Sequence, residues 1–367
     1  MSLAERTAPS VRRVRPARVA MLAGARFPII EPFAGGLEAH TWTLAREHHK
    51  AGTPVTLYAL AGSDARFTCR DLATVDQDSP LARAGLQGGT ESDQVEHYAY
   101  LKAMIDLAEQ PDLFDLVHNN GVHHLPVVLA ASLPIPMVTA LHIPPTTEME
   151  AVIQLRGPNR VGTFVAISQF TADAWRPLLG PMTVIANGID LDRWVPGPGG
   201  NHAVWTGRIV PEKAPHLAID AARLAGMRIR LAGPVHDRSY WRREVAPRLD
   251  EGATWVGHLD SKQLQAFVGA ARLSVVTPEW DEPFGLVVLE ALASGTPVAA
   301  FGRGGIPEIV DASCGRLAPA GDVPALADAM VQASALDRSA ARRRAESIGC
   351  ARRMAASYRE LYRHVLA

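Results

Sequence analysis

Two glutamates lie eight positions apart in the segment EWDEPFGLVVLEALASGTPVAAF. Glu282 is expected in a loop, Phe284 and Gly285 at the start of a helix, and Glu290 inside that helix. A helix N-terminus offers unpaired N–H groups and a positive dipole, so the backbone of Phe284, Gly285 and Leu286 could bind a diphosphate or sugar hydroxyls. Glu290 could accept hydrogen bonds from the two hydroxyls of a ribose. An acidic first turn with a solvated glutamate is the simpler alternative.

Two cations follow a predicted strand in the segment VWTGRIVPEKAPHLAIDAA. The strand ends at Thr206, and Gly207 permits a tight turn. Arg208 and Lys213 then project from the next loop and helix start. At the carboxyl edge of a parallel sheet, such cations can neutralise a diphosphate leaving group. Basic residues are common on protein surfaces, so this pair by itself is weak evidence for a binding site. The evidence is stronger because the helix with Glu290 lies in the same half of the chain.

The first half of the chain contributes glycines and a histidine. Gly35 and Gly36, in FAGGLEAHTW, follow the first predicted strand and precede a helix, an arrangement that lets phosphate approach the backbone. The pattern is not GxGxxG, so it does not indicate a dinucleotide. His142 closes the predicted strand PMVTALH and is expected to face the crevice between the halves. A purely structural role is the alternative for His142. For His118, the choice between a functional and a structural role is still more open.

The elements that must position these residues alternate between short apolar runs and longer amphipathic stretches, which predicts an α/β fold with mainly parallel sheets. A helix is expected over residues 37–51. Residues 193–202, RWVPGPGGNH, interrupt any element and separate two Rossmann-like domains, residues 17–195 and 201–345. The predicted strands are residues 18–23, 54–60, 116–119, 137–141, 163–167 and 182–186 in the first half and 203–206, 228–232, 253–256, 273–277 and 297–301 in the second.

The chain has 367 residues, enough for about two domains. Lys and Arg number 37 against 38 Asp and Glu, so no global charge attracts nucleic acid, which is not expected as a partner. The three cysteines are far apart in sequence, which argues against a thiolate metal site or a disulfide scaffold. Residues 1–18 lack the apolar core of a secretory signal and are expected to be a flexible leader. The arginine-rich residues 336–367 are expected to form a solvated helix interrupted at Gly349, with an anionic membrane surface as the alternative.

Together these segments resemble the retaining glycosyltransferases of family four, the group 1 glycosyltransferases, which have the GT-B fold. EPFGLVVLEALASGTPVAAF…GGIPEIV is similar to the EX7E signature of that family. FAGGLEAHTWTLA, VAISQFT, IANGIDLDRW and GRIVPEK resemble its other blocks, in the family's order. The resemblance covers residues 17–335. It implies two Rossmann-like domains with parallel sheets facing a central cleft, and a C-terminal helix, residues 350–367, that crosses back onto the first domain.

The resemblance also implies residue roles. Arg208 and Lys213 would stabilise the departing diphosphate, and Glu282 would hold hydroxyls of the transferred sugar, with His142 near the reaction. The expected catalytic residues are thus Glu282, Arg208, Lys213 and His142. Backbone of residues 256–259 is expected near the base. The expected donor-binding residues are Gly35, Gly36, Gly207, Phe284, Gly285, Leu286, Glu290 for the ribose, and Val256 and Gly257. The chain departs from the family at Ala214, where a glycine usually follows the lysine. Residues 62–110 are idiosyncratic, which leaves the acceptor open.

The expected function is retaining transfer of a sugar from a nucleotide-diphosphate sugar, with UDP favoured over GDP, to a saccharide, natural product or glycolipid hydroxyl. No cofactor and no catalytic metal are expected, because the DxD pattern of Asp190 and Asp192 falls in a block leading into the linker. A nucleotide-sugar 2-epimerase and a non-catalytic nucleotide-sugar binder are the alternatives. The protein is expected to be a cytoplasmic monomer or homodimer, with contact to the inner membrane face less favoured.

Overall fold

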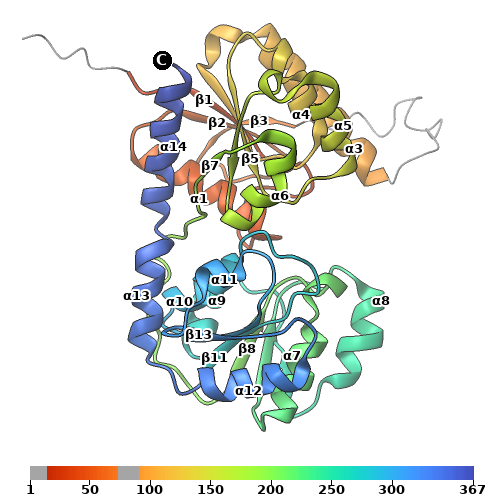
Figure 1. The fold of residues 1–367 in the computed structure, drawn as a ribbon, viewed down its shortest axis with the longest axis vertical. Coiled ribbons are helices and arrows are strands. Elements are labelled where there is room, and N and C mark those ends of the chain that lie inside the picture. The colour runs from red at the N-terminus through yellow and green to blue at the C-terminus, as the bar shows by residue number, and fades with distance from the viewer. Residues whose placement is uncertain (1–14, 73–90) are drawn as a thin grey trace, which may run out of the picture.

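Seven strands form a parallel sheet in the first half of the chain, in the order β3-β2-β1-β4-β5-β6-β7. The structure, a computed structural model, describes residues 15–72 and 91–367. Figure 1 shows this sheet in the upper lobe, surrounded by helices. The strands are β1 (Val19–Leu22), β2 (Val55–Ala59), β3 (Thr68–Asp71), β4 (Leu116–Asn119), β5 (Met137–Leu141), β6 (Thr163–Ala166) and β7 (Thr183–Val184). The helices are α1 (Gly36–Lys50), α3 (Glu91–Glu109), α4 (His124–Leu129), α5 (Thr147–Arg156) and α6 (Gln169–Leu179).

Six strands form a second parallel sheet in the lower lobe, in the order β10-β9-β8-β11-β12-β13. The strands are β8 (Ala203–Thr206), β9 (Ile229–Ala232), β10 (Ala253–Trp255), β11 (Leu273–Val276), β12 (Val298–Phe301) and β13 (Gly315–Ala318). The helices are α7 (Pro215–Leu224), α8 (Arg238–Tyr240), α9 (Ser261–Gly269), α10 (Leu286–Ala293), α11 (Ile306–Ile309) and α12 (Val323–Ala333). The central strands β1, β4, β5, β11 and β12 are buried along their whole length, as expected for parallel strands covered on both faces.

The predicted α/β class and two-sheet organisation are confirmed. Three predicted strands have the observed bounds (β4, β5 and β8), and the others begin or end within one or two residues of them. Sequence reasoning missed β3 and β13. The residues of β3 are mostly exposed and polar, and β13 begins with Gly315 and contains Arg316, so neither strand forms an uninterrupted apolar run.

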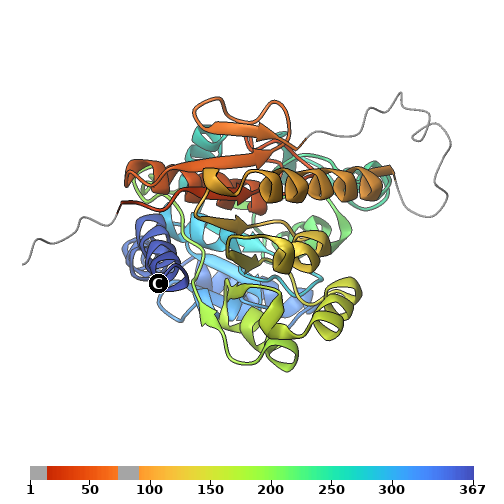
Figure 2. The same ribbon diagram turned by 90° about the horizontal axis from the view of Figure 1, so that it is seen from above.

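The C-terminal segment crosses from one lobe to the other as two helices, α13 (Arg338–Ile348) and α14 (Ala351–Val365). Figure 1 shows them running along one side of both lobes, and Figure 2 shows them from above. The helix α13 packs against α10 and α14 packs against α1, so the crossing implied by the family resemblance is confirmed. The prediction of a solvated helix was wrong, because Met354, Ala355, Tyr358 and Tyr362 are buried in the core of the upper lobe.

Arginines of α13 are used inside the protein. Arg338 donates hydrogen bonds to the carbonyls of Ala271 and Gly269, at 2.8 and 2.9 Å. Arg342 donates to the carbonyl of Ala293 at 2.9 Å. These bonds attach α13 to the loops of the lower lobe, which gives part of the arginine-rich sequence a structural role.

The two lobes also meet at the start of α6. The carboxylate of Glu308, on α11 of the lower lobe, accepts hydrogen bonds from the N–H groups of Gln169 and Phe170 at 2.9 and 2.6 Å. Ser168 Oγ donates to the carbonyl of Pro283 at 2.6 Å. An acidic side chain at a helix N-terminus is favourable because it pairs with the unbonded N–H groups and the positive dipole end. The lobes are therefore held together by polar contacts beside the cleft.

Two sequence predictions concern regions that are described only in part. The predicted flexible leader is residues 1–18, and its residues 1–14 are outside the described part of the chain. Within the described part, Arg15 and Arg18 form ion pairs with Asp115 at 2.8 and 3.0 Å. Within the region called idiosyncratic, residues 73–90 are outside the described part of the chain. Of the helices in the described ranges, none combines the length and the apolar character that crossing a membrane requires.

Candidate active site

A cavity of about 440 Å³ lies where the carboxyl ends of the two sheets face each other. Its walls include residues one or two positions after the ends of β1, β5 and β6 in the upper lobe and β8, β9 and β11 in the lower lobe. Open α/β folds bind ligands at this edge of their sheets. Most of the predicted site residues line it, namely Gly35, Gly36, His142, Gly207, Arg208, Lys213, Glu282, Phe284, Gly285, Leu286 and Glu290.

Lys213 and Glu282 form an ion pair in the cavity wall. Trp280 Nε1 donates a hydrogen bond of 3.1 Å to Glu282 Oε2, the same oxygen that Lys213 Nζ contacts. The Lys213 ammonium also lies 4.8 Å from the centre of the Trp280 ring, within the range of a cation–π interaction. These contacts fix an ammonium and a carboxylate side by side although they are 69 positions apart in the sequence.

The backbone at Lys213 is held in an unusual conformation. Ala214 has a φ of 44°, and in the described part of the chain it is the one non-glycine residue with a positive φ. Thr277 Oγ1 lies within hydrogen-bond distance of the carbonyls of Lys213 and Ala214, at 3.1 and 2.9 Å. The left-handed conformation at position 214 explains why the family usually has a glycine there. A residue with a side chain loses about 1–2 kcal/mol in this conformation.

Arg208 faces the glycine loop of the opposite lobe. A Cβ atom built on Gly35 would lie 3.9 Å from Arg208 Nε, and one built on Gly36 would lie 3.4 Å from Leu286 Cδ1. Gly35 immediately precedes α1 and Gly285 immediately precedes α10, so the N-termini of two helices meet in this part of the cavity. Two dipole ends together with Arg208 and Lys213 make it suited to an anionic ligand.

The helix α10 places Glu290 in the cavity. Gly285 has a φ of 102°, in the left-handed region that glycine adopts without strain, and this turn directs the chain into the helix. Glu290 follows one and a half turns later and is half-buried. Desolvation raises the pKa of its carboxyl group to about 8. The carboxylate of Glu290 therefore lacks the water that would stabilise its ionised form. Hydrogen bonds from two hydroxyls of a ligand could take the place of that water.

His142 belongs to a buried hydrogen-bond network. The Oδ1 atom of Asn120 lies 2.9 Å from His142 Nε2 and 3.1 Å from His118 Nε2, so both rings donate to one acceptor. His118 Nδ1 then accepts from the hydroxyl of Tyr362 at 2.6 Å, and the oxygen of that hydroxyl lies 3.3 Å from His48 Nε2. Burial lowers the pKa of His142 to about 3 and that of His118 to about 4. His142 is thus a neutral group fixed by a network that reaches helix α14.

Sequence reasoning missed a buried carboxylate in the upper wall. Glu38, in the first turn of α1, is 5% exposed, lines the cavity, and has a pKa raised by desolvation. His40, on the same helix, is also buried and its ring lies 4.8 Å from that of His142. The signal for both was their place in the first turns of the helix that begins at Gly36, at the carboxyl edge of the first strand. Trp280 was missed too, although it lies two residues before Glu282.

Val256 and Gly257, the first half of the segment 256–259 that was predicted near the nucleotide base, lie outside the cavity lining. The carbonyl of Gly257 accepts a hydrogen bond from the N–H of Gly233 at 2.8 Å, and the N–H of Val256 donates to Leu231 at 2.9 Å. The next residues, His258 and Leu259, do line the cavity. Val256 and Gly257 are thus part of the scaffold that presents those neighbours.

The two aspartates of the DxD pattern are held by arginines. Asp190 forms an ion pair with Arg46, and its Oδ1 accepts a hydrogen bond from the N–H of Asp192 at 3.0 Å. Asp192 is exposed and lies 3.8 Å from Arg352. Both carboxylates therefore have positively charged partners from other elements of the upper lobe and from α14.

Two family models match this chain. The model described as Glycosyltransferase Family 4 covers residues 34–193, and the model described as Glycosyl transferases group 1 covers residues 200–335. Together they include nearly all of both sheets and every residue of the cavity discussed above. The chain belongs to this family of glycosyltransferases.

Two kinds of curated relative are similar in sequence. A glycogen synthase of Mycobacterium tuberculosis is 30% identical over 64% of this chain, and the match spans 63% of the length of that relative. A D-inositol 3-phosphate glycosyltransferase of Mycolicibacterium paratuberculosis is 27% identical over 89% of this chain and 86% of its own length.

Solved structures share the fold. AviGT4, a glycosyltransferase involved in avilamycin A biosynthesis, has a TM-score of 0.70 at 22% identity, covering 96% of this chain and 98% of its own. HepE of Anabaena in complex with UDP-glucose has a TM-score of 0.73 at 19% identity, covering 95% and 100%. The GT-B fold implied by the sequence resemblance is thereby confirmed.

Proposed function

We propose that this protein transfers a sugar from a nucleotide-diphosphate sugar to a hydroxyl acceptor with retention of configuration, and that the nucleotide is UDP in preference to GDP. The observation that carries this proposal is the convergence of two cations, Arg208 and Lys213, and two carboxylates, Glu282 and Glu290, on one cavity. The similar fold of HepE has been solved with UDP-glucose, a ligand that offers the diphosphate, ribose and sugar for which such residues are suited.

In this proposal the cations act on the leaving group. Arg208 and Lys213 neutralise the charge that grows on the diphosphate as the bond to the sugar breaks, and the N-termini of α1 and α10 add to the stabilisation. Lysine has three N–H donors, so Lys213 can keep Glu282 while it donates to a phosphate oxygen. The mechanism needs no metal, because these side chains supply the positive charge.

The carboxylates hold the rest of the donor. Oε2 of Glu282 is engaged by Lys213 and Trp280, so Oε1 is the atom that would accept a hydrogen bond from a hydroxyl of the transferred sugar. Glu290 would accept from the ribose. The acceptor oxygen attacks from the face that the diphosphate leaves, and a phosphate oxygen takes its proton, which produces retention.

The two lobes would divide the substrates. Residues 201–345 would bind the donor, and residues 17–195 with helix 350–367 would bind a saccharide, natural product or glycolipid acceptor. Glu38 and His40, which are buried, and the half-buried His142 line the upper wall of the cavity, where they would meet the acceptor. Closure of the lobes would exclude water that could hydrolyse the donor.

The test is turnover of UDP-glucose and other nucleotide sugars with a panel of acceptors, measured as released nucleotide diphosphate. We expect Glu282→Ala and Lys213→Ala to lower transfer at least ~10²-fold, the scale of removing a key electrostatic contact. Lys262→Ala, an exposed lysine on α9, is the matched control and should retain the rate. Wild-type turnover in both site variants would refute the proposed site.

The alternatives are separated by omitting the acceptor. A 2-epimerase would consume the donor in the absence of an acceptor. A transferase requires an acceptor, and a non-catalytic binder leaves the donor unchanged in either case. The NMR coupling of the anomeric proton in the product tests retention. Transfer after removal of metal by a chelator tests whether Arg208 and Lys213 suffice.

A further inference from the structure

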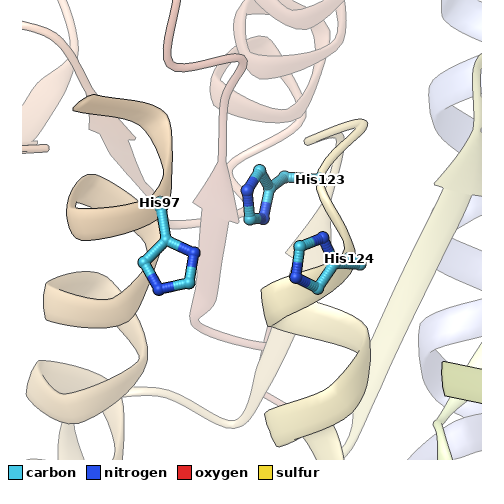
Figure 3. A group of neighbouring side chains, drawn as sticks. All are labelled: His97, His123 and His124. Carbon is cyan, nitrogen blue, oxygen red and sulfur yellow. The ribbon is translucent and has the colours of Figure 1, made fainter. Parts of the chain in front are cut away.

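Three histidines meet outside the group of residues used in the proposed transfer. His97 lies on α3, His123 immediately precedes α4, and His124 is the first residue of α4. One potential ligand atom of each lies within 4.8 Å of the other two. Figure 3 shows a ring nitrogen of each side chain turned toward the space between the three rings. The three side chains are half-buried and so remain reachable from solvent.

The three rings are near enough to one another to reach a common metal ion. The ring centres are 4.3 Å apart for His123 and His124, 5.8 Å for His97 and His123, and 6.3 Å for His97 and His124. A tetrahedral ion with ligand bonds of about 2.0–2.1 Å needs its nitrogens roughly 3.3 Å apart. The rings of His123 and His124 are stacked with an interplanar angle of 23°, so one of them must turn before both lone pairs point at one ion.

We propose that His97, His123 and His124 bind one divalent transition-metal ion of the zinc type, with the fourth coordination position open to water or to a carboxylate. Imidazole is a preferred ligand of such ions, and three protein ligands with one open position is an established arrangement for zinc. Glu148, on α5, interacts electrostatically with both His123 and His124, which adds negative charge beside the cluster.

The ion would join two elements that border the substrate cavity. His97 comes from α3, and the neighbouring residues Glu96 and Tyr100 line the cavity, as does Val122 beside His123. The Tyr100 ring stacks on His123 with ring centres 5.3 Å apart, and its hydroxyl donates to the carbonyl of Ala23 at 2.9 Å. Metal binding would therefore fix the upper wall of the cavity. The ion itself would not contact the part of the cavity around Arg208 and Lys213, where the diphosphate is proposed to bind.

Metal binding has a structural consequence at the start of α4. In the structure His123 Nδ1 accepts a hydrogen bond from the N–H of Leu125 at 3.1 Å. If the ion takes Nδ1, that lone pair is used, and if it takes Nε2 of a neutral ring, the proton moves to Nδ1. Either route ends the hydrogen bond, so metal binding removes the side-chain cap of α4.

The experiment uses the full chain, without a histidine tag, after removal of metals by a chelator. Zn²⁺ is titrated in competition with a colorimetric zinc indicator, and Co²⁺ is added separately to record its visible absorption. We expect one ion per chain, an intense tetrahedral Co²⁺ spectrum, and affinity at least about 10-fold lower in His97→Ala, because one of three protein ligands is lost. The exposed His49→Ala is the matched control and should bind as the wild type does.

Two results would overturn the proposal. One is the absence of stoichiometric Zn²⁺ binding by the wild type, and the other is equal affinity in His97→Ala and His49→Ala. If His97→Ala does not fold, as judged by circular dichroism, X-ray absorption of the zinc-loaded wild type decides instead. That spectrum should show about three imidazole nitrogens at about 2.0–2.1 Å, and a shell of oxygen ligands alone would refute the site. The proposed sugar transfer is tested separately, so either idea can fail without the other.

Discussion

Replacing Glu290 by glutamine should stabilise the empty protein while it weakens donor binding. In the folded chain burial raises the pKa of this carboxyl to about 8 from an ordinary value of 4.5. Between these two pKa values the folded state keeps a proton that the unfolded state has lost, so stability falls as pH rises. At 1.36 kcal/mol per pKa unit, the full penalty above the folded-state pKa is about 5 kcal/mol, and glutamine, which never ionises, avoids it.

The prediction is measured by urea unfolding of the wild type and of Glu290→Gln at several pH values. The advantage of the variant should grow by about 3 kcal/mol between pH 6 and pH 8–9, where the folded-state carboxyl becomes ionised. Glu360→Gln, at an exposed position on α14, is the control and should show no such trend. In parallel, nucleotide sugar should bind Glu290→Gln more weakly. An unfolding difference that does not change with pH would refute the reasoning that burial destabilises this carboxylate.

Three further outcomes follow from the geometry. Ala214→Gly should raise the free energy of unfolding by about 1 kcal/mol, because glycine adopts the left-handed conformation without strain; an unchanged or lowered denaturation midpoint would contradict this. Tyr362→Phe should lower the free energy of unfolding by about 1–3 kcal/mol, because buried nitrogens of His118 and His48 lose the hydroxyl that both contact. His142→Asn should flatten the acid dependence of stability, because His142, with a folded pKa of about 3, takes up a proton at pH 5 only in the unfolded chain. That proton costs the wild type about 2 kcal/mol between pH 7 and pH 5, and parallel pH profiles of the two proteins would argue against it.

The sequence by itself determined the local elements and most of the residues that line the cavity. Alternating short apolar runs and amphipathic stretches follow directly from parallel strands buried on both faces, so most strands could be placed within one or two residues. The segment containing Glu282 and Glu290 is a contiguous loop and helix, and its spacing along α10 is therefore encoded locally. The order of the motifs was sufficient to indicate the family and its fold.

Only the tertiary structure decided which distant side chains meet. The pairing of Lys213 with Glu282, and the approach of Arg208 to Gly35, join loops from different strands and from different lobes. The burial of Tyr362 depends on where α14 crosses, 244 residues from its partner His118. Periodicity reports which face of an element is apolar, but it does not report which surface will cover that face. For this reason the arginine-rich C-terminal helix looked solvated in the sequence, although its apolar stripe completes the core of the first lobe.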